Sequence, residues 1–500
     1  MTATGEPATG IPAQPAAEPS KPQLQEQEKD YADIVPVATR YDGLEFLKIK
    51  DLRSSLQARD SPFVVDNNAG GGFVGDSDLV AISIMQYDSP ESSGATCSQG
   101  LFDSSSTICM PLPPFALRSG PRRTVYFDPK QVTAAVVTCG GLCPGLNDVV
   151  QNIVYTLDDY GVPEDQIFGI RYGLRGFLDR HAKPVQLTHQ WVDGIQLKGG
   201  TVLGTSRGNA KIPEIVERLR LWGINMLFVI GGNGGNAAAH AIALECGRQS
   251  HPCAVVGVPK SIDNDIQLID KCFGFDTAVE EAQRSLVCAR VEAKSAGGIC
   301  IVKLMGRDAG WIALNASMAS GVVDVCLIPE IPFTFDKLIN RVREVLDGKH
   351  YAVICVAEGA GQTALADGDV GTDASGNKIL KDIGTHLRDL FKKSFKGVDV
   401  KYIDPSYMIR SIPTVTTDRI YCKVLGQGAV HGAFAGYTDF TVGLVNTHYV
   451  FLPTTTIIQS VRTVDPYGRQ WNRLKTAIAQ GEVGDWNIVL RANRSPLQEQ

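Results

Sequence analysis

The stretch NMLFVIGGNGGNAAAH, Asn225–His240, joins an apolar run to a glycine-rich turn and then to a second regular segment. Its apolar residues do not alternate with polar ones, which is typical of a strand in a parallel sheet covered on both faces. Gly231 and Gly232 end this predicted strand, and Gly234 and Gly235 precede a predicted helix. A strand, a glycine turn and a helix in this order favour an α/β fold with a phosphate-binding turn. A tight turn without a ligand is an equally open interpretation.

The same unit recurs from Val132 onward. The apolar runs that predict strands are AAVVT, NMLFVI, AVVGVP, GICIVKL and YAVICVA, and a helix is predicted to begin near Leu146. Apolar residues recur at helical spacing in two further segments: Ile212, Ile215, Val216 and Leu219, and Val279, Ala282, Leu286 and Ala289. We therefore expect an α/β fold of two doubly wound, Rossmann-like, three-layer αβα domains with mainly parallel sheets, plus an N-terminal extension.

The bulk composition excludes several classes of protein. A chain of 500 residues exceeds what one hydrophobic core usually supports, and a net charge of -6 gives no general attraction to nucleic acid or acidic membranes. No apolar run reaches the about 18 residues of a membrane helix, and no signal-peptide pattern opens the chain, so we expect a cytoplasmic protein. Cys300, Cys326 and Cys355 lie in apolar runs and predict buried thiols.

The first part of the chain differs from the rest. Residues 1–30 are rich in Pro, Ala, Gln and Glu, a composition that cannot recover the entropy of ordering, so a disordered tail is expected. Residues 31–125 mix short apolar runs with Ser-rich and Pro-rich patches. This N-terminal extension has no period from which a role can be predicted.

Ligands of open α/β sheets bind at the carboxyl ends of the strands, so the loops there are candidate sites. The loop TCGGLCPGLND, Thr138–Asp148, has paired glycines that let backbone amides approach an anion, although a plain turn is the alternative. The loop PKSIDNDIQLID places Asp263 and Asp265 two residues apart. In an extended loop they would point to opposite sides, so one could meet a hydroxyl and the other a metal. Asx-turn chemistry is the alternative.

Two further loops carry arginines. KLMGRDAGW places Arg307 in a glycine-flanked turn, where it suits a phosphate or a developing negative charge. AEGAG places Glu358 after a strand, and IDPSYMIR contributes Tyr407 and Arg410. Each arginine alone is better explained by a surface salt bridge. Their joint occurrence at these loops favours a binding site.

Six motifs in this order resemble the 6-phosphofructokinase family, and its plant-like ATP-using branch in particular: GGLCPGLND, GGTVLGTSRG, PKSIDNDI, KLMGRDAGWIA, VAEGAGQ and YIDPSYMIR. The resemblance implies transfer of the γ-phosphate of ATP to the 1-hydroxyl of fructose 6-phosphate, with Mg²⁺. It also implies a nucleotide-binding domain, residues 126–275 with 410–462, and a sugar-phosphate-binding domain, residues 276–409 with 463–495.

The resemblance also implies an oligomer. Family members commonly form tetramers whose sugar sites borrow basic side chains from a neighbour, and Lys401 is a candidate for such a side chain. A homo-tetramer, a homo-dimer or a hetero-oligomer with a paralogue is therefore expected.

The same resemblance assigns roles to individual residues. Asp263 would be the general base and Arg307 the second catalytic residue. The nucleotide would contact Gly141, Arg207, Gly208, Gly232, Asn233, Gly234 and Gly235. The sugar phosphate would contact Ser261, Ile262, Asp263, Met305, Gly306, Arg307, Glu358, Tyr407, Met408, Ile409 and Arg410. Mg²⁺ would be held by Asn233 and Asp265.

The turn GGNGG departs from the family's usual GGDGT or GGDGS. Asn233 keeps an oxygen that can coordinate a metal, but it lacks the negative charge that magnesium prefers. Gly235 lacks the hydroxyl of the family's Thr or Ser. Gly234 favours ATP, since pyrophosphate users carry Asp there, while Lys260 favours pyrophosphate only weakly. Two hypotheses stay open: an ATP-dependent 6-phosphofructokinase with altered metal binding, and a non-catalytic partner that regulates an active paralogue.

Overall fold

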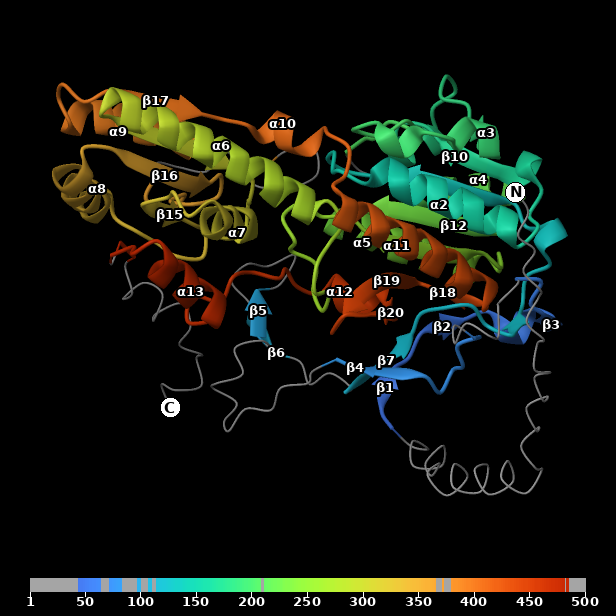
Figure 1. Cartoon of the computed structure of the whole chain (residues 1–500). Coiled ribbons are helices and arrows are strands. Elements are labelled where there is room, and N and C mark those ends of the chain that lie inside the picture. Colours follow the sequence, from blue (N-terminus) through green and yellow to red (C-terminus); the bar gives the residue numbers. More distant parts are fainter. Residues whose placement is uncertain are drawn as a thin grey trace, which may run out of the picture. The chain divides into compact units, whose positions relative to one another are not determined.

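The computed structural model describes residues 44–63, 72–82, 97–99, 107–109, 114–207, 211–365, 371–372, 379–481 and 483–484. The tail expected over residues 1–30 lies outside the described residues. The described residues from Glu45 onward belong to one compact unit, which is built on two sheets (Figure 1).

The large sheet has ten strands in the order β1-β7-β20-β19-β13-β12-β9-β10-β11, with β4 paired to β7. Its central strands are parallel: β9 (Ala134–Thr138), β10 (Ile167–Ile170), β12 (Met226–Gly231), β13 (Ala254–Pro259) and β19 (Phe440–Val445). Because β9 lies between β10 and β12, the strand order reverses there. The carboxyl ends of β9 and β12 therefore form the switch point at which doubly wound sheets bind ligands.

The N-terminal extension completes one edge of this sheet. Strand β20 (His448–Pro453) pairs antiparallel with β19 and with β7 (Phe115–Arg118), and β7 in turn pairs with β1 (Phe46–Leu47) and β4 (Leu79–Ala81). At the other edge, β11 (Val185–Gln186) pairs with β10. The extension thus covers an edge that would otherwise expose unpaired backbone groups.

The small sheet is entirely parallel. Its order is β15 (Val325–Leu327), β16 (Ala352–Ala357), β14 (Ile299–Leu304) and β17 (Val400–Ile403). The other described strands form two-stranded pairs: β2 (Lys50–Asp51) with β18 (Tyr437–Thr438), β3 (Arg59–Asp60) with β8 (Thr124–Val125), and β5 (Cys97–Gln99) with β6 (Thr107–Cys109).

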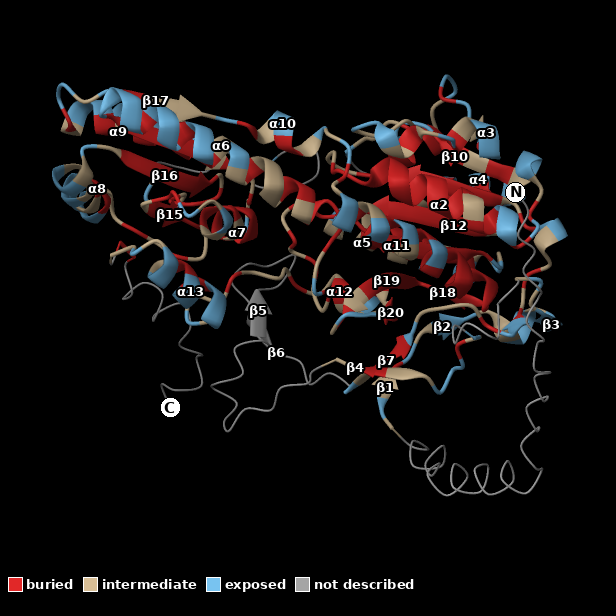
Figure 2. Ribbon diagram, viewed as in Figure 1, coloured by how far each residue is buried: buried red, intermediate tan, exposed pale blue. Residues whose placement is uncertain are grey.

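Helices cover both faces of both sheets. On the large sheet, α2 (Leu146–Asp159) and α11 (Thr416–Phe434) share a core with one face, and α4 (Ile212–Leu221) and α5 (Asn233–Arg248) with the other. On the small sheet the pairs are α6 (Phe275–Ala296) with α7 (Trp311–Ser320), and α8 (Phe335–Lys349) with α9 (Ile383–Ser394). Figure 2 shows buried strands between helices whose outer faces are exposed.

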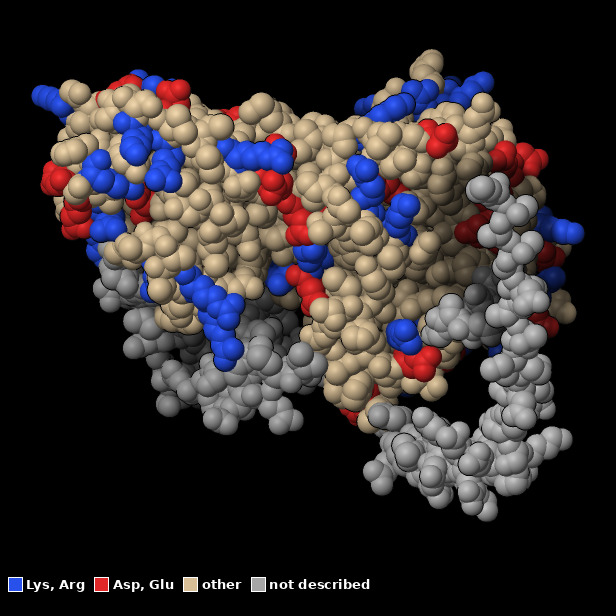
Figure 3. Space-filling view, in the orientation of Figure 1, with Lys and Arg blue, Asp and Glu red and all other residues tan. Residues whose placement is uncertain are grey.

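The remaining helices are short. They are α3 (His189–Val192), α10 (Ser406–Arg410), α12 (Thr454–Ile457) and α13 (Arg469–Ala477), with 3-10 turns at Arg53–Ser55, Pro129–Gln131, Glu164–Gln166, Gly173–Phe177 and Ile195–Leu197. Among the helices of the described ranges, none has the length and apolar character needed to cross a bilayer. On the face in Figure 3, basic and acidic side chains are interspersed.

Helix α6 links the two sheets. At its start, the backbone N–H and the hydroxyl of Thr277 both donate to Oδ2 of Asp418 on α11, each at 2.7 Å. Farther along, Ala282, Leu286 and Ala289 are fully buried in the core that includes β14 and α7. One helix therefore packs at one end on the large-sheet part and at the other on the small-sheet part.

The predicted fold class is confirmed, and each predicted apolar run is a strand. The runs correspond to β9, β12, β13, β14 and β16, and the helix expected near Leu146 is α2. The apolar positions of the two predicted helical faces are buried or partly buried, on α4 and α6. Cys300, Cys326 and Cys355 are buried, as predicted.

Candidate active site

Two glycine turns lie side by side at the switch point of the large sheet. Cys139 N, just after β9, donates to Ile230 O at 2.8 Å. A Cβ on Gly231 would stand 2.8 Å from the Cα of Gly235, so only glycine lets α5 begin this close to β12. Gly232 is the N-cap residue of the 16-residue helix α5. The unpaired N–H groups at this helix start favour an anion beside the turn after β9.

Two basic side chains flank these turns. A Cβ on Gly141 would stand 3.2 Å from Nη2 of Arg207, so the guanidinium lies against the turn after β9. Lys260 is buried, and its Nζ lies 3.6 Å from the Cβ position of Gly140. Gly208 lies outside the described residues. A helix start and two cations together suit a chain of phosphates.

The loop after β13 is a turn. Asn264 N donates to Ser261 O at 3.3 Å, which closes a turn over residues 261–264, and Asn264 has a φ of 57°. The premise of an extended loop, from which Asp263 and Asp265 were expected on opposite sides, is therefore wrong. Instead, Oδ1 of Asp265 accepts a short hydrogen bond from the Ser261 hydroxyl, and Oδ2 accepts one of 3.0 Å from Nδ2 of Asn233.

The two carboxylates are partly buried and lie near each other. Burial, then the charges of Asp265 and Glu358, raise the pKa of Asp263 well above its usual value, and Lys260 opposes the shift. Burial also raises the pKa of Asp265, against the hydrogen bond from the Ser261 hydroxyl. Within the described part of the chain, Oδ1 of Asp263 has no hydrogen-bond partner, nor has Oδ1 of the neighbouring Asn233. These buried oxygens are available to a ligand.

The small sheet contributes a second pair of loops. Met305, Gly306 and Arg307 follow β14, and Glu358 follows β16. A Cβ on Gly359 would stand 1.7 Å from Arg307 O, so glycine is required where the loops touch. Burial raises the pKa of Glu358, and the charge of Arg307 opposes that shift. The carboxylate of Glu358 therefore lies near the Arg307 guanidinium.

Helix α10 brings Arg410 to the same place. The guanidinium of Arg410 also opposes the raised pKa of Glu358, and it lies 4.8 Å from the ring centroid of Tyr407. Its Nε is buried and, in the residues that the structure describes, unpaired. The neighbours differ: Tyr407 and Met408 are 73% and 65% exposed, whereas Ile409 is 1% exposed and packs in the core.

Four of the predicted residues, from both sheets, therefore lie close enough for their charges to affect one another. The charge of Glu358 raises the pKa of Asp263, and the charges of Arg307 and Arg410 oppose the raised pKa of Glu358. Ser261 and Ile262 are buried beside them. Lys401 stands apart, since its Nζ lies 2.6 Å from Oε2 of Glu292 on α6.

The structure adds two residues that the sequence prediction left out. Asn236 is buried, and its Nδ2 donates to Gly231 O and Gly232 O at 3.2 and 3.1 Å, which fixes the second glycine turn. Arg462 N donates to Asp265 O at 2.8 Å. The role of Asn236 could have been predicted, because the sequence shows an asparagine in the first turn of a predicted helix. The contact of Arg462 could not, because it joins segments that are distant in the sequence.

Comparison with known proteins places this geometry in a family. The phosphofructokinase family model matches residues 133–433. ATP-dependent 6-phosphofructokinase 5, chloroplastic, of Arabidopsis thaliana is 50% identical over 417 residues, 82% of this chain and 76% of its own. ATP-dependent 6-phosphofructokinase 7 of the same plant is 47% identical over 374 residues, 73% of this chain and 76% of its own.

A solved structure agrees on the fold. The pyrophosphate-dependent phosphofructokinase from Marinobacter aquaeolei superposes with a TM-score of 0.60 at 21% identity, over 71% of this chain and 93% of that one. The match of more than half of the chain to the family model, and the identity to the plant relatives, lead to one conclusion. The chain belongs to the phosphofructokinase family.

Proposed function

We propose that the protein is an ATP-dependent 6-phosphofructokinase, which transfers the γ-phosphate of ATP to the 1-hydroxyl of fructose 6-phosphate in glycolysis. The products are fructose 1,6-bisphosphate and ADP. The observation that carries the proposal is the proximity of four charged groups: Asp263, Arg307 and Glu358, from loops of both sheets, and Arg410, from helix α10. The plant relatives named above are ATP-dependent 6-phosphofructokinases, which supports the same reaction and donor.

ATP would bind at the switch point of the large sheet. Its phosphates would meet the N-terminus of α5 and the turns that contain Gly141 and residues 232–235, with Arg207 beside them. Among the described residues, no heavy atom lies within 4 Å of a Cβ built on Gly234. This open space supports ATP as the donor, because the α-phosphate and ribose need room there.

Fructose 6-phosphate would bind between the small-sheet loops and the loop after β13. Arg410 would hold the 6-phosphate, and Glu358 would accept hydrogen bonds from sugar hydroxyls. The proposed contact set also includes Ser261, Ile262, Met305, Gly306, Tyr407, Met408 and Ile409. The side chain of Ile409 is in the core, so its contact would be through the backbone.

The chemistry would rest on Asp263 and Arg307. Asp263 would take the proton of the 1-hydroxyl as its oxygen attacks the γ-phosphorus. Burial raises the pKa of Asp263, which increases its strength as a base, while Lys260 favours the ionised form that must accept the proton. Arg307 would stabilise the negative charge that develops on the transferred group.

The residues around Asp265 fit a magnesium ion that would bind together with ATP. Within the described ranges, no cluster of three or more His, Cys, Asp or Glu could hold a metal alone. Asp265 and Asn233 do offer hard oxygen ligands, and the Asn233 Oδ1 is buried and unpaired in that part of the chain. Bound with ATP, Mg²⁺ would neutralise charge on the phosphates.

A coupled assay for fructose 1,6-bisphosphate tests the proposal. Wild type and Asn233→Asp are compared with ATP and with pyrophosphate over a range of magnesium concentrations. We expect turnover by wild type with ATP. Binding of fructose 6-phosphate without turnover under any condition would instead support the regulatory hypothesis drawn from Asn233 and Gly235.

We further propose a cytoplasmic homo-oligomer, a dimer or a tetramer. Lys401 would serve a neighbour's sugar site only after leaving its ion pair with Glu292. Light scattering coupled to size exclusion measures the mass of the oligomer, and copurification with a tagged paralogue tests the hetero-oligomer. A fluorescent fusion distinguishes the cytosol from plastids, which matters because one relative is chloroplastic.

A further inference from the structure

Lys303 is a charged residue within the apolar strand β14. Ile299 and Ile301, four and two positions before it on the same face of the strand, are buried in the core shared with α8 and α9. The Lys303 side chain is 15% exposed. Removing an ammonium from water to this extent is costly unless carboxylates surround it. The partners of Lys303 therefore define its role.

The carboxylates of two loops meet this ammonium. Nζ of Lys303 lies 2.8 Å from Oδ2 of Asp404 and 3.5 Å from Oδ1 of Asp382. The hydroxyl of Tyr402 lies 3.5 Å from each of these carboxylates. Burial opposes the charge of both groups. Nevertheless, Asp404 raises the pKa of Lys303, and Lys303 and Ser406 lower the pKa of Asp404. Both shifts favour the charged pair.

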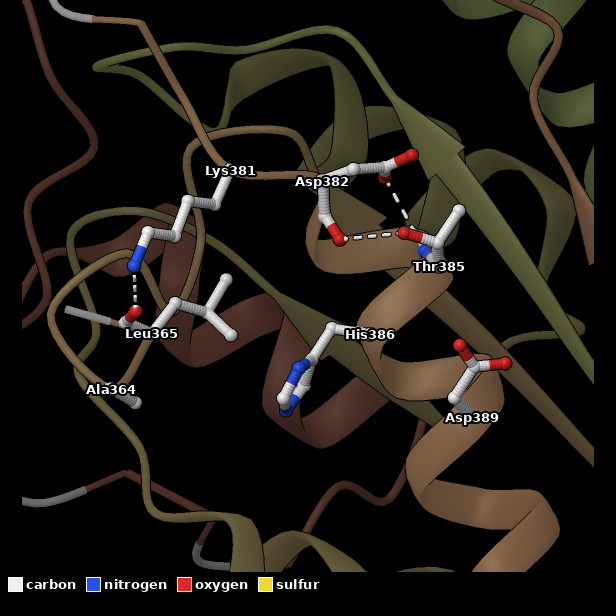
Figure 4. A pocket seen from close by; sticks show the side chains of 7 residues that line it. All are labelled: Ala364, Leu365, Lys381, Asp382, Thr385, His386 and Asp389. Carbon is white, nitrogen blue, oxygen red and sulfur yellow. Dashed lines mark hydrogen bonds between the residues drawn. The ribbon is translucent and has the colours of Figure 1, made fainter. Parts of the chain in front are cut away.

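Each carboxylate fixes the start of a helix. Oδ1 of Asp404 accepts from Ser406 N at 3.1 Å and from its hydroxyl at 2.6 Å, and Ser406 is the first residue of α10. Asp382 is the N-cap of α9 and accepts from Gly384 N at 3.0 Å. Figure 4 shows Asp382 beside Thr385 in the wall of a pocket of about 430 Å³. Lys303 thus joins β14 to the starts of α9 and α10.

We propose that Lys303 is a positioning residue for the sugar-phosphate site, because it holds Asp404 and, through Asp404, sets the position of α10 and Arg410. The inference rests on the proposed function, in which Arg410 binds the 6-phosphate. Lys303 also opposes the raised pKa of Glu358, so its charge supports the ionised form of that side chain. Because α10 is already held in place, Arg410 can bind the 6-phosphate without the cost of ordering its helix first.

Steady-state kinetics of Lys303→Met test the inference. We expect the KM for fructose 6-phosphate to rise by about 10–100-fold, the range for losing a charged hydrogen bond, while kcat and the KM for ATP change by less than about threefold. Lys303→Arg retains a cation and should restore most of the affinity. Asp404→Asn should raise the same KM, and the double variant should be no worse than the worse single variant.

The matched control is Lys349→Met, which removes an ammonium that pairs with Asp324 elsewhere in the small-sheet part. Thermal melts and calorimetric binding of fructose 6-phosphate accompany each variant. A folded Lys303→Met with wild-type sugar affinity overturns the inference. If wild type has no turnover, the proposed function fails, and calorimetry still decides the role of Lys303. If Lys303→Met does not fold, Asp404→Asn decides it, and wild-type affinity in that variant overturns the inference.

Discussion

Asn233 donates a 3.0 Å hydrogen bond from Nδ2 to Oδ2 of Asp265 and so joins the start of α5 to the loop after β13. With the Ser261 hydroxyl on Oδ1, both oxygens of Asp265 have side-chain donors. An aspartate at position 233 would remove one donor and set two carboxylates against each other. Such a pair is favourable only when a proton or a cation is present.

Asn233→Asp should therefore make the stability of the protein depend on magnesium. In EDTA we expect a loss of about 1–3 kcal/mol in the free energy of unfolding, because a buried carboxylate loses its donor. Magnesium should restore much of this loss and should saturate the variant at a lower concentration than wild type. Thermal melts with EDTA and with Mg²⁺ measure both effects, and equal melting in EDTA would contradict them.

Asp263→Asn should separate catalysis from stability. Turnover should fall by about 10²–10⁴, as for loss of a general base, while calorimetry should still detect fructose 6-phosphate. The melting temperature should be equal or higher, because Asp263 is a partly buried carboxyl beside other carboxylates. Asp263→Ser is the second variant for this test. An unchanged turnover number would remove Asp263 from the role of base.

Arg410→Lys should weaken sugar-phosphate binding. Lysine keeps the charge but loses the planar set of donors that suits a phosphate, so the KM for fructose 6-phosphate should rise by about 10–100-fold. Arg343→Lys is the control, because it makes the same exchange at an arginine outside the proposed site, 5.7 Å from the ring centroid of Phe395. The same KM for Arg410→Lys as for wild type would show that the 6-phosphate binds elsewhere.

Gly234→Asp should fold normally and disfavour ATP. A Cβ at this position meets no heavy atom of the described residues within 4 Å, so the melting temperature should stay near that of wild type. The added charge would stand where the α-phosphate is proposed to bind. We expect a higher KM for ATP and an unchanged KM for fructose 6-phosphate. An unaltered KM for ATP would place the nucleotide elsewhere.

Glu330 should make stability fall as pH rises. Burial raises the pKa of Glu330 to about 7, against hydrogen bonds from Gly310 N and Val464 N. Between the usual carboxyl pKa and about 7, the unfolded chain loses a proton that the folded protein keeps, so the folded state loses about 3 kcal/mol over that window. The loss should be absent in Glu330→Gln. Melting temperatures of both proteins across pH 4 to 8 test whether stability falls as the pH rises.

The order of strands and helices was predictable because the buried strands are continuous apolar runs. The edge strands of the extension were not, since two to four residues carry no pattern. The conformation of Asn264 was also missed, because asparagine adopts both extended and left-handed backbone. Lys303 was visible as a charge inside an apolar run, but its partners come from loops that only the fold brings together.

Helix α6 sets how the two substrates can approach each other. A helix does not stretch, so the 22 residues of α6 keep the spacing of the two sheets constant where it packs on both. Gly274 and Gly297 flank it with φ values of 82° and 65°. If ATP and fructose 6-phosphate bind as proposed, the phosphoryl group crosses between two parts of the protein whose distance is set by the length of α6.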